Sequence, residues 1–305
     1  MVGEKFLPTS GMELYGQYGK YRLEQNIGHG GNGSVFTVEI IERKESLPKE
    51  IKYVIKILSF ESNDKKEVEK RTTRFEKEIR DVIFIQKKIT GIIPIYDSSY
   101  LCEDKQKCLW YLMPFAEAYH PKKYSTLEKL EQMLQLGKCV NQLHALDYAH
   151  RDIKPKNLLI YNGKLCLSDF GLIWNRNNCD EHITEVNDRL GPMSIRPPEL
   201  QSVKNIDEID YRKSDVYLFA KTTWMILCCN NSGFSGEYNR TNSNIYLDVD
   251  NLQVETAEPL HLMMEMATKD NYWERTNITE CINYLEDQIK VIKSVDTASK
   301  GTVDR

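Results

Sequence analysis

The sequence lacks the cysteine patterns that organise zinc sites and disulfide-rich domains. Its 8 cysteines form no C-x-x-C pair and no cluster with histidine at the spacing of zinc ligands. A structural zinc site is therefore disfavoured. In a chain of 305 residues, which is long enough to bury a sizeable core, these cysteines are typical of reduced and mostly buried thiols. We accordingly expect a cytoplasmic protein.

Long apolar runs and an excess of positive charge are also missing. No stretch approaches the roughly 20 apolar residues of a membrane-spanning helix, and the first residues, "MVGEKFLPTSGMELYGQYGK", contain no apolar core of a signal peptide. The 41 Lys and Arg residues face 45 Asp and Glu residues, for a net charge of -4. A dedicated nucleic-acid binder would normally be clearly basic. We therefore expect neither a membrane nor a nucleic acid as the partner.

What the sequence does have is a short glycine-rich segment, "IGHGGNGSVF", at residues 27–36. Gly28, Gly30 and Gly33 have the spacing G-x-G-x-x-G, which suits a dinucleotide-binding turn, a flap over nucleotide phosphates or a hairpin without a ligand. A dinucleotide-binding turn is followed by a helix, whereas "SVFTVEII" is typical of a strand. A nicotinamide-dependent oxidoreductase is therefore the weakest interpretation.

The first half of the chain is otherwise rich in strand signals. Segments dominated by Val, Ile, Tyr and Phe predict strands over residues 21–28, 33–41, 52–58, 94–101 and 108–118. One helix is predicted over residues 67–88, because apolar residues recur there at i, i+4, i+7 and i+8 from Phe75.

The second half is predicted to be mainly helical, over residues 127–149, 214–229 and 277–292. The middle segment is apolar on nearly all sides, which indicates a central buried helix. The sequence thus predicts an α+β fold in which a small strand-rich lobe precedes a larger helical lobe. The expected parts are an N-terminal extension (1–20), a strand-rich lobe (about 21–113), a connecting segment (about 114–117), a helical lobe (about 118–292) and a polar tail (293–305).

Four further motifs follow the glycine-rich segment: "YVIK" (53–56), "HRDIKPKN" (150–157), "SDFG" (168–171) and "PPEL" (197–200). In order and spacing the whole set resembles the signature of eukaryotic-type (Hanks-type) serine/threonine protein kinase catalytic domains. The resemblance covers about residues 21–290, nearly the whole chain. It implies a bilobal protein-kinase-like fold and transfer of the γ-phosphate of Mg-ATP to a protein hydroxyl.

The resemblance implies an ATP site. Lys56 would hold the α- and β-phosphates, and Glu78, in the context "RFEKEI", is preferred to Glu76 as its partner. The segment "YLMPFA" resembles the hinge, and its proline keeps the carbonyl that adenine uses, because proline lacks only the N–H. The implied nucleotide contacts are Ile27, Gly28, Gly30, Gly33, Val35, Val54, Lys56, Glu78, Met113, Pro114, Ala116 and Leu159. The aliphatic members of this set suit ordinary core packing equally well.

The resemblance also implies the catalytic residues. Asp152 would orient or accept the proton of the substrate hydroxyl, and Lys154 would reach the γ-phosphate. In this family a lysine at that position goes with serine/threonine specificity. Asn157 and Asp169 would bind two Mg²⁺ ions. Taken alone, Asp152 suits a turn beside Pro155 as well.

Four residues of the second half match structural positions of the family. Glu199 and Arg275 match a buried ion pair, and Asp215, at the start of the apolar helix, matches the anchor of the catalytic loop. His150 matches a packed structural histidine. Small-molecule kinases with a similar first lobe usually lack the Glu199, Arg275 and Asp215 set, so it favours a protein substrate.

The sequence departs from the family pattern in the loop before "PPEL". Pro192 stands where serine/threonine kinases usually carry a threonine that contacts the catalytic residues, and proline cannot make that hydrogen bond. Asp188 stands where many members carry an activating phosphothreonine, whose phosphate Arg151 would bind. We hypothesise that Asp188 supplies a fixed carboxylate instead. The alternative is a switch operated by phosphorylation of Thr184 or Ser194.

Together these observations predict a cytoplasmic serine/threonine protein kinase that uses ATP and Mg²⁺ and acts on protein substrates. Two other classes stay open. A pseudokinase scaffold would bind ATP without transfer, although a scaffold has no chemical need for the full set of Lys56, Asp152, Asn157 and Asp169. A small-molecule kinase would phosphorylate a metabolite but no protein.

Overall fold

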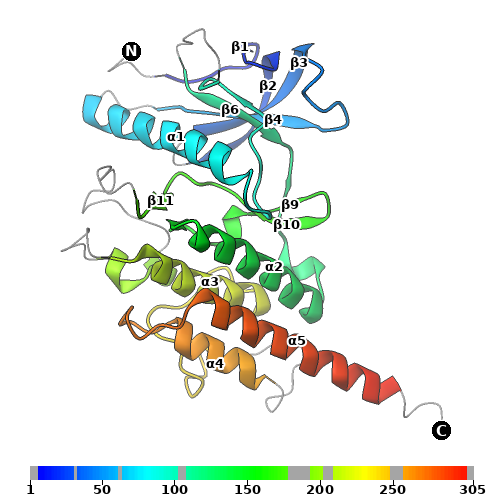
Figure 1. The fold of residues 1–305 in the computed structure, drawn as a ribbon, viewed down its shortest axis with the longest axis vertical. Coiled ribbons are helices and arrows are strands. Elements are labelled where there is room, and N and C mark those ends of the chain that lie inside the picture. The colour runs from blue at the N-terminus through cyan, green and yellow to red at the C-terminus, as the bar shows by residue number, and fades with distance from the viewer. Residues whose placement is uncertain are drawn as a thin grey trace. The chain divides into compact units, whose positions relative to one another are not determined.

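A computed structural model of the chain describes residues 6–30, 33–60, 64–101, 108–177, 193–201, 209–247 and 257–300. The chain divides into two compact units (Figure 1). Unit 1 comprises Met1–Glu117 together with Phe170–Ile173, and unit 2 comprises Ala118–Asp169 together with Trp174–Arg305. Unit 1 is built mainly from strands and unit 2 mainly from helices, which confirms the α+β fold predicted from the sequence.

Unit 1 contains a six-stranded antiparallel sheet with the strand order β1-β2-β3-β4-β6-β5. The strands are β1 (Glu13–Tyr15), β2 (Gly19–Gly30), β3 (Gly33–Arg43), β4 (Tyr53–Ile57), β5 (Asp97–Ser98) and β6 (Trp110–Pro114). The predicted segments 21–28 and 33–41 fall within β2 and β3, whereas the segments 52–58, 94–101 and 108–118 contain the shorter strands β4, β5 and β6. Residues 13–15, which we assigned to an N-terminal extension, instead form the first strand of this sheet.

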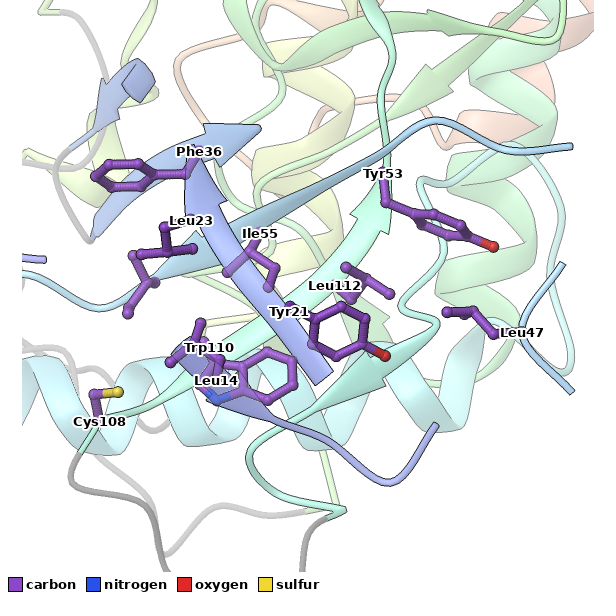
Figure 2. Packing of buried hydrophobic residues seen from close by; sticks show 11 residues of the cluster. Leu14, Tyr21, Leu23, Phe36, Leu47, Tyr53, Ile55, Cys108, Trp110 and Leu112 are labelled. Atoms are coloured by element: carbon purple, nitrogen blue, oxygen red, sulfur yellow. The ribbon is translucent and has the colours of Figure 1, made fainter. Parts of the chain in front are cut away.

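One face of the sheet carries the hydrophobic core of unit 1. Because side chains alternate along a strand, Phe36, Ile55 and Leu112 on three neighbouring strands point to the same side and are nearly or fully buried. Figure 2 shows them in one cluster with Tyr21 and Trp110, whose rings meet edge to face with centroids 5.6 Å apart. The aromatic side chains supply much of the buried area of this cluster.

A buried carboxylate fastens the turn between β1 and β2 to β5. Asp97 is fully buried and accepts hydrogen bonds from the N–H groups of Gln17 and Tyr18, at 3.1 and 2.8 Å, and from the hydroxyl of Tyr21, at 2.6 Å. Burial, followed by the carboxylate of Asp97, raises the pKa of the Tyr21 hydroxyl, which therefore remains a donor. A Cβ atom at Gly16 would collide with the Asp97 carboxylate, so this close approach requires glycine.

Helix α1 (Lys65–Ile85) is the predicted helix of unit 1, and Figure 1 shows it running beside the sheet. Asp64 caps its first turn by accepting a hydrogen bond from the Lys66 N–H, at 2.9 Å. The helix buries a stripe at helical spacing that includes Phe75, Ile79 and Val82. This stripe is the one predicted from the sequence.

Unit 2 is built around four helices within the described ranges, namely α2 (Thr126–Ala145), α3 (Tyr211–Leu227), α4 (Glu258–Ala267) and α5 (Ile278–Lys300). Helix α2 packs against α3 and α5, and α4 packs against the same two helices. Helix α3 is buried along nearly its whole length, which confirms the predicted central helix. Helix α5 continues past residue 293, into the segment that we assigned to a polar tail.

Short strands and turns complete unit 2. Strand β9 (Leu158–Tyr161) forms an antiparallel hairpin with β10 (Lys164–Leu167), and β8 (Tyr148–Ala149) pairs with β11 (Trp174–Asn175). Strand β7 (Glu117–Ala118) stands where the chain passes from unit 1 to unit 2. Single turns of 3-10 helix cover Pro121–Lys123, Pro155–Asn157, Met193–Ile195 and Pro198–Leu200.

The cysteines within the described ranges are free thiols, and Cys108, Cys139, Cys166 and Cys281 are buried. Burial raises the pKa of Cys139 and of Cys281 to about 12, so both stay protonated. In the same part of the chain, no helix combines the length and the apolar composition that crossing a membrane would need.

Candidate active site

One face of the sheet in unit 1 gathers several of the predicted nucleotide contacts. In the register of β3, β4 and β6, Val35 lies opposite Lys56 and Val54 lies opposite Met113. Residues paired across antiparallel strands share a face, so these four side chains point away from the hydrophobic cluster of Figure 2. Val54 is buried, whereas Val35 and Met113 are half-buried. The alternation of the strands thus leaves this aliphatic surface partly open.

Lys56 forms a buried ion pair with Glu78. The Lys56 Nζ lies 2.7 Å from the Glu78 Oε1, and the two side chains are 11% and 1% exposed. Helix α1 presents Glu78 on its buried stripe, three residues after Phe75, while Glu76 faces outward and is exposed. Helical spacing therefore explains why Glu78, the glutamate preferred from the sequence, meets the lysine.

A tyrosine that we did not predict joins this pair. The Tyr111 hydroxyl donates a hydrogen bond of 2.8 Å to the Glu78 Oε1, the same oxygen that accepts from Lys56. Tyr111 lies on β6 directly opposite Lys56 and two residues before Met113. The period-2 alternation of a strand places residues 111 and 113 on one face, so a sequence signal for Tyr111 existed.

The described residues of the glycine-rich segment end β2 and begin β3, two strands that pair with each other. Gly28 lies opposite Val35, and Gly30 lies opposite Gly33. A Cβ atom at Gly33 would approach the Ile57 carbonyl oxygen to 2.5 Å, so the packing of β3 against β4 requires glycine there. A Cβ atom at Gly28 would meet only Val35, at an ordinary 3.7 Å. Packing against the residues that the structure describes therefore does not explain glycine at position 28.

The remaining predicted nucleotide contacts lie at separate points of the chain. Ile27 is on β2 and 44% exposed, and Pro114 ends β6 and is buried. Ala116 follows in the segment between β6 and β7 and is half-buried. Leu159 lies on β9 in unit 2, where it pairs with Cys166.

Asp152 in unit 2 is held by a compact set of hydrogen bonds. Its carboxylate accepts from the Lys154 Nζ, at 2.8 Å to Oδ1 and 2.7 Å to Oδ2, and from the Asn157 Nδ2, at 2.9 Å. Asn157 also donates to the Asp152 carbonyl oxygen, at 2.8 Å. Asp152 is 7% exposed and Asn157 is 5% exposed. The catalytic residues predicted from "HRDIKPKN" are thus in direct contact.

His150 supports this loop as a neutral imidazole. Its Nδ1 accepts a hydrogen bond from the Asp152 N–H, at 3.2 Å, so its Nε2 carries the proton and donates to the Ser168 carbonyl oxygen, at 3.1 Å. Burial lowers the pKa of His150, against the opposing effect of the charges on Asp215, Asp152 and Asp169. The histidine therefore links the loop to the residue before Asp169.

Asp215 anchors the loop from helix α3, as the sequence predicted. Its fully buried carboxylate accepts from the N–H groups of His150 and Arg151, each at 2.7 Å, and lies 3.0 Å from the His144 Nε2. Arg151 has φ 64°, a left-handed conformation that is uncommon for a long side chain. The two bonds to Asp215 offset the cost of this conformation and fix the backbone immediately before Asp152.

The β9–β10 hairpin brings the two predicted metal ligands to one end. Asn157 directly precedes β9, and Ser168, which directly follows β10, donates from both its N–H and its hydroxyl to the Asn157 carbonyl oxygen, at 2.9 Å each. Asp169 is the next residue, is exposed and has φ 61°. Within the described ranges, no group of three or more His, Cys, Asp or Glu side chains could hold a metal by itself.

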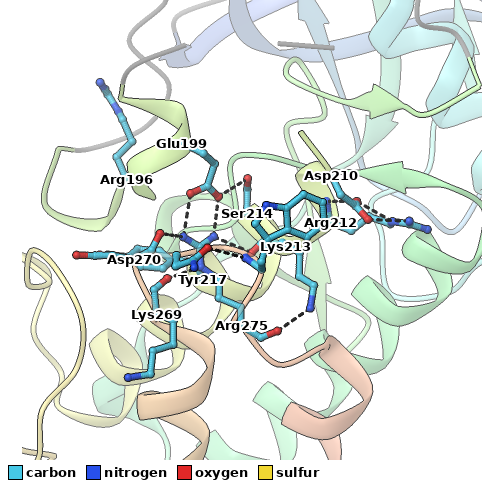
Figure 3. Close-up of polar contacts among 12 residues, drawn as sticks. Arg196, Glu199, Asp210, Arg212, Lys213, Ser214, Tyr217, Lys269, Asp270 and Arg275 are labelled. Atoms are coloured by element: carbon cyan, nitrogen blue, oxygen red, sulfur yellow. Dashed lines mark hydrogen bonds and ion pairs between the residues drawn. The ribbon is translucent and has the colours of Figure 1, made fainter. Parts of the chain in front are cut away.

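The predicted ion pair between Glu199 and Arg275 is confirmed and is drawn in Figure 3. Two hydrogen bonds join the guanidinium to the carboxylate, at 2.6 and 2.8 Å. The Arg275 side chain is 0% exposed and the Glu199 side chain is 6% exposed. The Ser214 hydroxyl donates to the same carboxylate, at 2.7 Å. Arg275 also donates to the Lys269 carbonyl oxygen, at 2.6 Å. The pair thus connects the "PPEL" turn to the start of α3 and to the segment before α5.

The predictions for the loop before "PPEL" fall partly outside the described residues. Thr184, Asp188 and Pro192 all lie outside the described ranges. Ser194 lies in the turn Met193–Ile195 and is half-buried. Arg151 packs its guanidinium over the Tyr211 ring, with the Cζ 4.9 Å from the ring centroid.

The fold and these contacts agree with a comparison against known families. The family model of the protein kinase domain matches residues 21–284. The chain therefore belongs to the protein kinase domain family, as the motifs indicated, and has a protein-kinase-like fold.

Individual relatives match at modest identity. Serine/threonine-protein kinase PrkC of Bacillus subtilis is 28% identical over 247 residues, which cover 78% of this chain and 34% of PrkC. Probable serine/threonine-protein kinase YbdM of the same bacterium is 29% identical over 161 residues, 50% of this chain and 57% of YbdM. Dual specificity protein kinase Ttk of Danio rerio is 26% identical over 184 residues, 57% of this chain and 17% of Ttk. The chain thus spans about a third of PrkC and just over half of YbdM.

Proposed function

We propose that this protein is an active protein kinase that transfers the γ-phosphoryl group of Mg-ATP to serine or threonine hydroxyls of proteins. The observation that carries the proposal is the Asp152 cluster. A buried carboxylate that accepts hydrogen bonds from Lys154 and Asn157 has the composition of a phosphoryl-transfer site. Membership of the kinase family supports the same reaction class.

Asp152 is proposed to orient the attacking hydroxyl and to take up its proton. Its carboxylate is held by the Asn157 side chain and its backbone by the hydrogen bond from its N–H to His150, so the lone pairs of the carboxylate have a defined direction. Lys154, bonded to both carboxylate oxygens, is proposed to turn toward the transferred phosphoryl group and to neutralise the charge that develops on it. Phosphoryl transfer involves little covalent chemistry by the protein, so such positioning accounts for most of the catalysis.

The residues of unit 1 fit an adenine nucleotide. Val35, Val54 and Met113 supply a partly open aliphatic surface on the Lys56 side of the sheet. Gly28 keeps clear the space beside Val35 that a Cβ atom would fill, and packing against the described residues does not account for this glycine. We propose that this surface holds the adenine, and that Lys56, oriented by Glu78, holds the α- and β-phosphates.

The donors for Mg²⁺ are proposed to be the Asn157 side-chain oxygen and the Asp169 carboxylate. Mg²⁺ prefers oxygen ligands and is commonly bound through one or two carboxylates together with substrate phosphates. The exposed carboxylate of Asp169, beside the paired Asn157 and Ser168, suits that pattern. Bound Mg-ATP would supply the phosphoryl group and the cations that offset its charge.

The proposal extends to the acceptor and to the location of the protein. Lys154 and the names of PrkC and YbdM support serine or threonine, and the Glu199–Arg275 pair supports a protein substrate. The name of Ttk, a dual specificity kinase, makes tyrosine the alternative to test. We retain a cytoplasmic location as part of the proposal, on the basis of the cysteine pattern.

The proposal is tested by incubating the purified protein with Mg-ATP and a generic basic protein and mapping phosphosites by mass spectrometry. Asp152→Asn is compared with wild type and with Asp287→Asn, an exposed aspartate on α5. Loss of a general base typically lowers the rate by about a hundred- to ten-thousand-fold. We expect phosphate on serine or threonine with wild type and Asp287→Asn, and this large loss with Asp152→Asn.

Other outcomes of this experiment would contradict the proposal in different ways. ATP binding without transfer to any acceptor would indicate a scaffold. Transfer to small molecules only would indicate a metabolite kinase. Equal transfer by wild type and by Asp152→Asn would remove Asp152 from the mechanism.

A further inference from the structure

A buried tyrosine hydroxyl contacts the ion pair that is proposed to hold the ATP phosphates. The Tyr111 hydroxyl donates to the Glu78 Oε1 at 2.8 Å, and the Lys56 Nζ lies 2.7 Å from the same oxygen. Tyr111 is 5% exposed and Glu78 is 1% exposed. A carboxylate oxygen has two lone pairs, so it can accept both bonds at once, and in a buried site each is stronger than in water.

The sheet holds Tyr111 and Lys56 next to each other. The two residues are cross-strand partners on β6 and β4, so their backbones are fixed by the sheet ladder. Glu78 comes from a different element, helix α1. The Lys56 Nζ also lies 5.6 Å from the Tyr111 ring centroid and 5.8 Å from that of Phe75, within range of cation–π attraction. Glu78 is therefore tied to the sheet at two points.

We infer that Tyr111 is a positioning residue that keeps Glu78, and with it α1, in place when Lys56 turns toward the nucleotide phosphates. The inference rests on the proposed function. When a lysine shares its charge between a glutamate and a phosphate, its hold on the glutamate weakens. The hydroxyl of Tyr111 is a neutral donor, so its bond to Glu78 does not compete with the phosphates and persists through that change.

The chain offers a matched control for this idea. Tyr53, on the neighbouring strand β4, is also a buried tyrosine whose hydroxyl makes a hydrogen bond, in its case to the Pro48 carbonyl oxygen at 3.0 Å. Tyr53 lies on the opposite face of the sheet, three residues from Lys56. Tyr111→Phe and Tyr53→Phe each remove one hydroxyl from the same sheet and keep the ring.

The test combines three measurements on wild type, Tyr111→Phe and Tyr53→Phe. The first is hydrogen exchange of the α1 amides in the protein without nucleotide. The second is kcat/KM for ATP in phosphoryl transfer. The third is the dissociation constant of adenosine, which has no phosphates for Lys56 to hold. Exchange reports local opening of α1 directly and needs no activity.

We expect Tyr111→Phe to speed exchange in α1 and to lower kcat/KM by about tenfold each, the low end for loss of a hydrogen bond to a charged group. Adenosine affinity should change less than about twofold, because unit 1 keeps its packing and the adenine surface is untouched. Tyr53→Phe should leave all three quantities near the wild-type values. A role that acts through Glu78 and Lys56 lowers kcat/KM for ATP and leaves adenosine affinity nearly unchanged, whereas general loosening of unit 1 would weaken both.

Two results would overturn the inference. Exchange and transfer that are unchanged in Tyr111→Phe would show that the hydroxyl does not hold Glu78. A parallel loss of adenosine affinity would indicate general loosening of unit 1. A wild-type protein that transfers no phosphate would refute the proposed function instead, and the exchange measurement would then decide by itself whether Tyr111 holds α1.

Discussion

Replacing Glu199 by glutamine would break the buried ion pair with Arg275 while keeping the size and shape of the side chain. In the native protein the Arg275 side chain is fully buried and donates two short hydrogen bonds to this carboxylate. Glutamine removes the negative charge and turns an NH₂ group toward the guanidinium, so a donor faces a donor. The remaining hydrogen-bond acceptors of Arg275 are backbone carbonyl oxygens, such as that of Lys269, and its guanidinium lies over the Tyr217 ring; neither kind of partner carries a net charge.

The expected cost follows from the burial of the arginine. Removing one partner of a buried ion pair leaves an uncompensated charge and typically costs about 3–5 kcal/mol. A whole domain is stable by only about 5–15 kcal/mol. Glu199→Gln should therefore remove a large part of the free energy of unfolding of unit 2. Because the pair is shielded from solvent, added salt should change this loss little.

The assay is urea unfolding followed by far-ultraviolet circular dichroism, a signal to which the helices of unit 2 contribute strongly. The matched control is Glu258→Gln, since Glu258 also pairs with an arginine, Arg240, at 2.7 Å but is 54% exposed. Arg240 keeps its bonds to Glu265 in that variant, and an exposed pair contributes at most about 1 kcal/mol. Equal losses in the two variants would refute the reasoning that burial sets the cost.

Two further predictions concern stability. Burial lowers the pKa of His150 below its ordinary value near 6.5. Below that pH the histidine therefore binds a proton in the unfolded state but not in the folded state. As the pH falls, this group should lower the free energy of unfolding by up to about 1.4 kcal/mol per pH unit until the folded-state pKa is reached. Urea titrations of the wild type at pH 7.5 and 5.5 would measure this change. The same pH dependence in His150→Gln would contradict the assignment to His150. Gly33→Ala should lower the free energy of unfolding by about 1–3 kcal/mol, because its Cβ would crowd the Ile57 carbonyl oxygen. Gly28→Ala should leave the free energy of unfolding unchanged and weaken ATP binding. Thermal unfolding and ATP titration of both variants test this pair, and equal destabilisation would contradict it.

Much of unit 1 could be predicted from local patterns. Enrichment in Val, Ile, Tyr and Phe located β2, β3, β4 and β6, and helical spacing from Phe75 located α1. The same spacing shows why Glu78 rather than Glu76 meets Lys56, because residues three apart share a helical face and residues one apart do not. These are properties of neighbouring residues, which the sequence displays directly.

Contacts between distant residues could not be predicted in the same way. Asp97 lies in the predicted strand segment 94–101, where nothing in the sequence marks its carboxylate as buried, and its partners Gln17 and Tyr18 are about 80 positions away. The bond between Tyr111 and Glu78 depends on how α1 packs on the sheet, which periodicity alone does not specify. The length of α5 was underestimated because its last turns are polar and offer no apolar stripe.

The Asp97 contacts show that unit 1 begins before the match to the protein kinase family model begins. The family match begins at residue 21, whereas two of the hydrogen-bond donors that surround the Asp97 carboxylate are supplied by residues 17 and 18. A fragment trimmed to the family boundary would keep every motif and leave a buried negative charge without these donors. The match to the family model therefore starts after residues that take part in unit 1, and β1 and the turn that follows it belong to this unit by the hydrogen bonds that they make.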